Sequence, residues 1–200
     1  MGDIGKSEFP SKVLFAHTDT LRRYLKEAKE PATAQVVEML DGAKPEGAEW
    51  AATKPDNRIQ EWEFNRAAPG HQAAILEANQ KVIGKCLEGA LANVQQARSH
   101  LVPTQSHGAG TVYELRAGNG PRRFSELLSL RWDILRLTPS QCTEAKVHAE
   151  TFSKLMDAMD EKGGFTTANL TAAARALEQL EVELGKSIKS AATISPWSPQ

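Results

Sequence analysis

The sequence has very little cysteine and almost no net charge. Only Cys86 and Cys142 occur among 200 residues, and their spacing matches neither a disulfide framework nor a cysteine zinc site. Lysine and arginine number 24 against 25 for aspartate and glutamate, so the formal net charge is −1. No overall field therefore attracts nucleic acid or membranes, and any such binding needs a local patch.

Long apolar runs are missing as well. No stretch reaches the roughly 20 apolar residues of a membrane-spanning helix, and the first residues lack the basic and apolar regions of a secretory signal. We therefore expect a cytoplasmic protein without membrane contact. Both cysteines fall on apolar faces of predicted helices, which favours small core residues.

The motifs of nucleotide, metal and nucleophilic chemistry are also absent. Gly185-Lys186-Ser187 ends like a phosphate-binding loop, but Leu180 stands where that motif needs glycine. No histidine pair has zinc-protease spacing, and no Gly-x-Ser-x-Gly elbow occurs. We predict no cofactor and no metal, and we favour a protein that is not an enzyme.

Helical periodicity is what the sequence does contain. Apolar residues recur at spacings of three and four, which predicts a long helix over 71–101 and a second over 124–137. The same spacing from Ser11 to Ala28 predicts a helix near the start. We predict an all-α fold, a helical bundle of five or six helices whose best-packed part is 124–190.

Capping residues predict where the last two helices begin and end. Thr138 has the position of an N-cap, with Pro139 first in the helix and Gln141 three residues after the cap. Gly163-Gly164 predicts the end of that helix. Thr166 then predicts the cap of the next one.

A small β-hairpin is predicted near residues 111–124. Residues 111–116 alternate between apolar and polar, which is a weak strand pattern. A glycine-rich turn over 117–121 would let Arg122–Phe124 pair back. Residues 102–111 contain proline and glycine and predict a loop.

The predicted domain organisation is simple. Residues 1–10 form a loose N-terminus, residues 11–190 form a single helical domain, and residues 191–200 form a tail rich in proline. In the tail, Trp197 lies between Pro196 and Pro199. Extended proline segments lose little entropy on binding, so this tail is a candidate docking peptide. The alternative is a tail that folds back onto its own core or is disordered.

Arginines gather in one stretch that contains no lysine. Arginine suits planar, bidentate contact with phosphate or carboxylate, and the aromatic rings of Tyr113 and Phe124 could stack on bases. The alternative is that these arginines pair with Glu114, Glu126 and Asp133. The candidate phosphate or nucleic-acid site consists of Arg116, Arg122, Arg123 and Arg131, with Arg136 in the same stretch.

These features leave three classes of function. The first is a non-enzymatic interaction or assembly protein that binds another protein or itself through helix faces. Val37, Val112 and Val182 lie off the main apolar stripes and leave surface for a partner. The second is a small helical subunit of a nucleoprotein complex that contacts nucleic acid through the arginines. The third is an enzyme without a sequence signature, which would show a deep polar pocket with perturbed pKa values.

Overall fold

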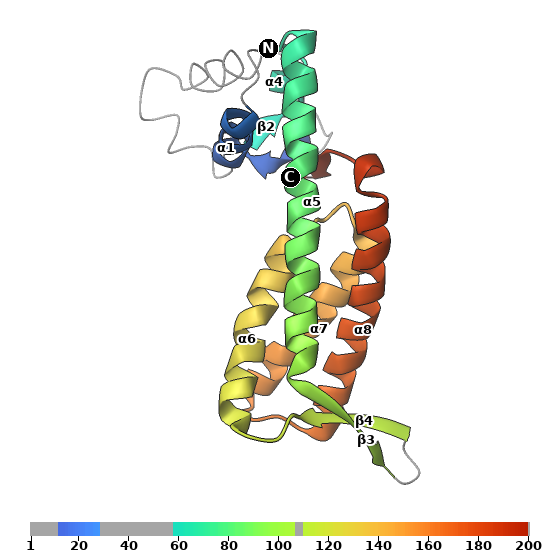
Figure 1. The fold of residues 1–200 in the computed structure, drawn as a ribbon. Helices are drawn as coiled ribbons and strands as arrows, with labels where there is room; N and C mark the ends of the chain where they lie inside the picture. Colours follow the sequence, from blue (N-terminus) through green and yellow to red (C-terminus); the bar gives the residue numbers. More distant parts are fainter. Residues whose placement is uncertain (1–11, 29–57, 107–109, 200) are drawn as a thin grey trace, which may run out of the picture. The chain divides into compact units, whose positions relative to one another are not determined.

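The computed structural model describes residues 12–28, 58–106 and 110–199. Helices dominate it and two small sheets accompany them (Figure 1), which confirms the α-dominant class. The chain divides into two compact units, here called unit 1 (Met1–Ile83 with Ser195–Gln200) and unit 2 (Gly84–Ile194). The boundary falls inside the long helix α5 (Pro69–Ser99). It also falls inside the range 11–190 that we predicted as one domain.

Unit 1 contains a three-stranded antiparallel sheet. Its order is β2 (Arg58–Gln60), β1 (Lys12–His17) and β5 (Trp197–Pro199). Helices α1 (Thr18–Ala28), α4 (Glu61–Phe64) and the first part of α5 complete the described part of the unit. The helix predicted from Ser11 is therefore wrong over residues 12–17, because pairing with two strands on both sides extends this segment and the helix begins only at Thr18.

Asn79 on α5 ties the central strand to the tail. Its side chain is fully buried. The amide oxygen accepts a hydrogen bond from the Ala16 backbone N–H at 2.8 Å, and the amide nitrogen donates to the Pro196 carbonyl at 3.2 Å. The Phe15 N–H donates to the same carbonyl at 3.0 Å. One polar side chain thus satisfies backbone groups from opposite ends of the sequence.

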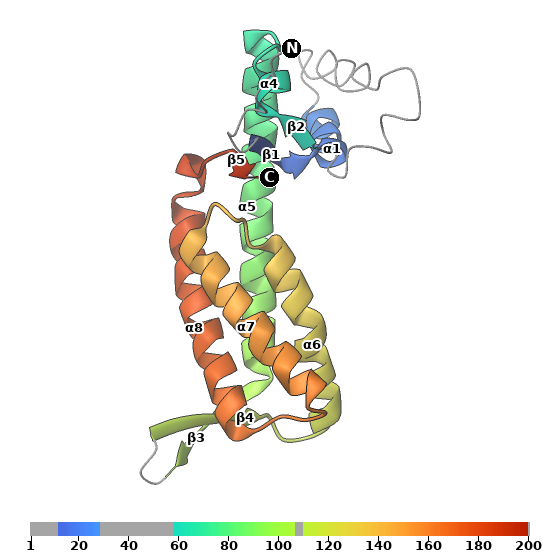
Figure 2. The ribbon, with the colours of Figure 1, turned by 180° about the vertical axis from the view of Figure 1, so that it is seen from behind.

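Unit 2 consists mainly of helices that follow one another in sequence. They are the second part of α5, α6 (Gly120–Leu137), α7 (Thr143–Glu161) and α8 (Thr167–Lys189), followed by the short 3-10 helix η1 (Ala191–Thr193). Helix α7 packs against α6 and α8 (Figure 2). The largest fully buried side chains of these three helices are Leu127, Ile134, Phe152, Met156, Met159, Leu177 and Leu180.

The hairpin of unit 2 lies earlier in the chain than predicted. Strand β4 (Gly110–Leu115) agrees with the predicted strand, but its partner is β3 (Leu101–Ser106), which we expected to be a loop. Each strand of a two-stranded sheet is an edge strand, and edge strands tolerate a proline such as Pro103. Residues 122–124 instead belong to α6, because Asn119 caps that helix and Pro121 stands in its first turn.

The predicted start of α7 is also wrong. Thr138 ends α6, since its backbone N–H and its hydroxyl both donate to the Ile134 carbonyl, at 3.1 and 2.7 Å. Helix α7 begins at Thr143 instead. The predicted end and cap further on are confirmed: Gly163 has a φ of +68°, and the Thr166 hydroxyl accepts from the Asn169 N–H.

The sequence predicted no membrane-spanning helix and two cysteines in the core. Within the described ranges, no helix is both long enough and apolar enough to cross a membrane. Cys142 is buried as expected, whereas Cys86 is partly exposed, and both thiols are free. Residues 1–10 and Val37 lie outside the described residues.

Candidate anion-binding site

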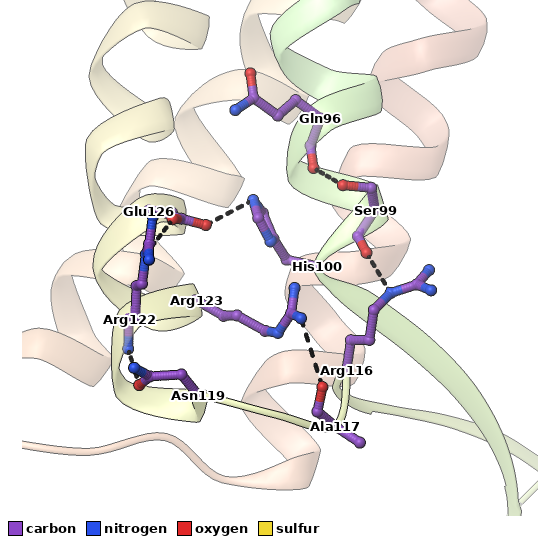
Figure 3. Close-up of polar contacts among 9 residues, drawn as sticks. All are labelled: Gln96, Ser99, His100, Arg116, Ala117, Asn119, Arg122, Arg123 and Glu126. Carbon is purple, nitrogen blue, oxygen red and sulfur yellow. Dashed lines mark hydrogen bonds and ion pairs between the residues drawn. The ribbon is translucent and has the colours of Figure 1, made fainter.

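Three of the four predicted arginines lie at one end of unit 2. Arg116 follows β4, and Arg122 and Arg123 stand in the first turn of α6 (Figure 3). Residues 117–119 join these elements in a tight turn. Gly118 has a φ of +114°, which favours glycine, and the Asn119 side chain accepts the Arg122 backbone N–H at 3.2 Å.

Backbone carbonyls, not carboxylates, hold two of these arginines in place. The Arg116 Nε donates to the Ser99 carbonyl at 2.8 Å, and an Arg123 Nη donates weakly to the Ala117 carbonyl at 3.4 Å. Neither guanidinium has a carboxylate partner among the described residues. Each keeps N–H donors for another acceptor, because a guanidinium carries five.

The other arginines of this stretch do pair with acids, as the alternative interpretation expected. The Arg122 Nε lies 3.1 Å from a carboxylate oxygen of Glu126, and Arg136 lies 3.2 Å from Asp133. Both pairs join residues on the same face of α6, three or four residues apart. Such exposed pairs contribute little to stability, typically about 0.5 kcal/mol.

His100 is the residue of this cluster that the sequence did not reveal. It lies between α5 and β3 and is only 7% exposed. Within the part of the chain that the structure describes, neither ring nitrogen has a hydrogen-bond partner, and the Arg123 Nε is also buried without one. Glu126 Oε2 lies 3.4 Å from His100 Nε2, which is within ion-pair distance although the two atoms form no hydrogen bond. Buried polar atoms without partners are rare and costly, at about 1–3 kcal/mol each.

Arg131 does not join the other three arginines. It lies two turns further along α6 and is buried at the contact with α7, where its Nε is 2.7 Å from Asp157 Oδ1. An Nη donates to the Leu128 carbonyl at 2.9 Å. Its guanidinium also lies 5.0 Å from the ring centroid of Trp132. This arginine therefore contributes to helix packing and to the surface at Trp132.

The two aromatic residues that we considered for base stacking are engaged within the fold. The Tyr113 hydroxyl donates to the Glu178 carboxylate on α8, and this bond raises the pKa of Tyr113. The Tyr113 backbone N–H donates to the Thr171 hydroxyl at 2.8 Å. Phe124 packs against Phe165, with 5.3 Å between ring centroids. The hairpin and the start of α6 are anchored by these contacts.

The two thiols do not have the pKa shift of an activated nucleophile. Burial raises the pKa of both thiols, Cys86 and Cys142, which is opposite to the shift of a reactive cysteine. Burial lowers the pKa of Lys146, whose Nζ donates to the Leu135 carbonyl at the end of α6. Over the described residues, no group of three or more histidine, cysteine or acidic side chains could hold a metal ion.

The predicted docking tail lies in unit 1. Trp197 is half-buried, its ring contacts Phe64 edge to face at 5.3 Å, and its backbone is in register with Leu14. Pro196 gives its carbonyl to Asn79, and Pro199 is in register with Lys12. This arrangement corresponds to the fold-back alternative, and docking of the tail to a partner stays a prediction.

Comparison with protein-family models, with curated proteins and with solved structures gives no match.

Proposed function

We propose that this chain is a non-enzymatic helical interaction protein, which binds another protein or a second copy of itself through helix faces of unit 2. The observation that supports the proposal is Trp132 on α6, which is 59% exposed. Tryptophan is enriched among the residues that dominate protein–protein binding energy, and its large apolar area favours burial against a partner.

Arg131 keeps this tryptophan in a defined place. The buried Arg131 is fixed by Asp157 and by the Leu128 carbonyl, so the guanidinium against the indole is itself rigid. A side chain that is ordered before binding loses less entropy when a partner covers it. Val147 on α7 and Val182 on α8 are about equally exposed, at 50% and 53%, so each of these helices offers apolar surface.

Light scattering behind size-exclusion chromatography tests the proposal, with Trp132→Ala as the variant and Trp62→Ala as the matched control. Trp62 lies on α4 in unit 1, is 50% exposed and has Arg66 against its ring at 4.9 Å. We expect a discrete oligomer of the unmodified chain that Trp132→Ala dissociates, with an affinity loss of about tenfold or more, and that Trp62→Ala leaves intact.

A monomer at every concentration contradicts self-association and leaves a different protein as the partner. We then expect a defined complex from host extract that forms with the unmodified chain and with Trp62→Ala, but not with Trp132→Ala. Equal behaviour of the two variants in both experiments contradicts the proposal. The cytoplasmic location expected from the sequence belongs to the same proposal, and cell fractionation tests it.

A further inference from the structure

We propose that the cluster of His100, Arg116, Arg122, Arg123 and Glu126, here called the Arg/His cluster, binds a single phosphate group. This site is separate from the surface at Trp132. Two guanidinium groups, those of Arg116 and Arg123, have no carboxylate partner among the described residues. The imidazole of His100 is buried without a hydrogen bond, and the partly exposed carboxylate of Glu126 lies beside it.

Charge at the cluster favours an anion. Among the residues drawn in Figure 3, the guanidinium groups of Arg116, Arg122 and Arg123 accompany one carboxylate, that of Glu126, and only Arg122 pairs with it, so the cluster is positive before His100 is considered. Arg116 and Arg123 use only one donor each on a backbone carbonyl. Carbonyl bonds orient a guanidinium without neutralising it. The remaining donors can then form the bidentate bonds that arginine makes with phosphate.

The buried polar atoms indicate where a ligand oxygen would lie. The Nδ1 of His100 and the Nε of Arg123 have no hydrogen-bond partner among the described residues, and the Nε2 of His100 has only the Glu126 carboxylate, at 3.4 Å. His100 points into the space between Arg123 and Glu126 (Figure 3). The Glu126 side chain is 38% exposed, so it can turn towards solvent and leave its place to another anion. Glu126 therefore acts as a competitor that occupies the site when phosphate is absent.

The size of the cluster favours one phosphate over a nucleic-acid backbone. A strand of nucleic acid is bound by basic residues spread along a surface. Here Arg131 is buried against Asp157, and Arg136 pairs with Asp133. Among the arginines of residues 116–136, those not paired with an acid on the helix surface or buried at a helix contact thus lie at the turn between β4 and α6, and the chain as a whole carries a charge of −1.

A titration with inorganic phosphate tests the site. The side-chain Nε–Hε signals of ¹⁵N-labelled protein are recorded at constant ionic strength adjusted with sodium chloride, and calorimetry gives the Kd. We expect saturable shifts at Arg116 and Arg123. The double variant Arg116→Gln/Arg123→Gln should weaken binding by about tenfold or more, because each lost bond is charge-assisted. Arg136→Gln, which removes one positive charge at the other end of α6, should leave the Kd unchanged.

The Glu126→Gln variant distinguishes a phosphate-binding site from a cluster that only stabilises the fold. Removal of the competing carboxylate should tighten phosphate binding several-fold, while a purely structural cluster predicts no gain. This variant also covers the case in which the double arginine variant fails to fold, as judged by circular dichroism.

Three results would overturn the proposal. The first is the absence of shifts beyond those in chloride, and the second is equal weakening by Arg136→Gln. The third comes from RNA oligonucleotides with and without a 5′-phosphate. Affinity that grows with length and ignores the terminal phosphate would identify an extended nucleic-acid surface instead. A preference for the 5′-phosphate would support a single-phosphate site and show that the phosphate can be attached to a larger ligand.

Discussion

Unit 1 and unit 2 differ in how far apart along the chain their contacting segments lie. In unit 2, α7 packs between its neighbours in sequence, α6 and α8, and β3 pairs with the next strand, β4. In unit 1, β1 near the start pairs with β2 and also with β5 at the other end. Closing long loops costs entropy before any contact stabilises them, so the sheet of unit 1 depends more on specific long-range bonds.

Both units bury large apolar side chains, such as Leu14, Leu21 and Ile75 in unit 1 and those of successive helices in unit 2. Unit 1 differs in a polar side chain buried at the centre of its sheet contacts. In unit 1 the buried Asn79 connects α5, β1 and the segment before β5 through two hydrogen bonds. The strands of unit 1 should therefore respond to the loss of the Asn79 hydrogen bonds, and unit 2 to the loss of buried volume in its helical core. Two substitutions test this difference.

The largest effect is expected for Phe152→Ala in unit 2. Phe152 on α7 is fully buried, and removal of a buried phenylalanine ring costs about 3–5 kcal/mol through lost burial and a cavity. Urea unfolding and amide hydrogen exchange measure the loss. Exchange should accelerate throughout Gly84–Ile194 and much less in the strands of unit 1.

Val147→Ala on the same helix is the control, because Val147 is half exposed and should change the unfolding free energy by less than about 0.5 kcal/mol. Equal acceleration of exchange in both units by Phe152→Ala would show that they unfold as one cooperative body. Unit 1 and unit 2 would then not lose stability independently of each other.

A smaller, differently located loss is expected for Asn79→Ala in unit 1. The Pro196 carbonyl keeps its bond from the Phe15 N–H, but the Ala16 N–H loses its acceptor. A buried donor left unsatisfied costs about 1–3 kcal/mol. Exchange of the β1 and β5 amides should therefore accelerate most. Asn93→Ala, on the part of α5 in unit 2, is the control; if it has the same effect on β1, the role given to Asn79 is wrong.

The difference between contacts of neighbouring segments and contacts of distant segments explains which elements could be predicted from the sequence. Helix α5 spans Pro69–Ser99 against a prediction of 71–101, and Gly163 and Thr166 end and begin helices where expected. Such features depend on neighbouring residues. Strand β1 was mistaken for helix because its apolar residues also fit a helical stripe, and its partners lie far away in sequence.

The candidate site could also be predicted only where its residues are close in sequence. Arg116, Arg122 and Arg123 are close in sequence, so a shared turn brings them together. Arg131 was predicted with them, but its partner Asp157 lies on another helix, which the local pattern does not contain. The burial of His100 depends on how α5, β3 and α6 meet, and a single histidine at a helix end gives no sign of it.

The smallest expected effect is a pH dependence of the unfolding free energy, which distinguishes unit 2 from unit 1. Burial raises the pKa of Cys86 and Cys142 above the ordinary value of 9.0, and both thiols belong to unit 2. From pH 9.0 up to the raised values, the folded chain holds protons that the unfolded chain has released. Linkage then requires the unfolding free energy of unit 2 to fall as pH rises through this window, while below pH 9.0 the thiols have no effect.

Urea unfolding at about pH 8 and about pH 9.5 measures this fall, and Cys86→Ala/Cys142→Ala identifies its source. The double variant should be less sensitive to pH than the unmodified chain. Lys146 acts in the opposite direction, because its lowered pKa makes the unfolded chain the stronger proton binder below 10.5. The variant should therefore gain stability, relative to the unmodified chain, as pH rises. An identical pH slope in both proteins would show that the thiols do not cause the fall.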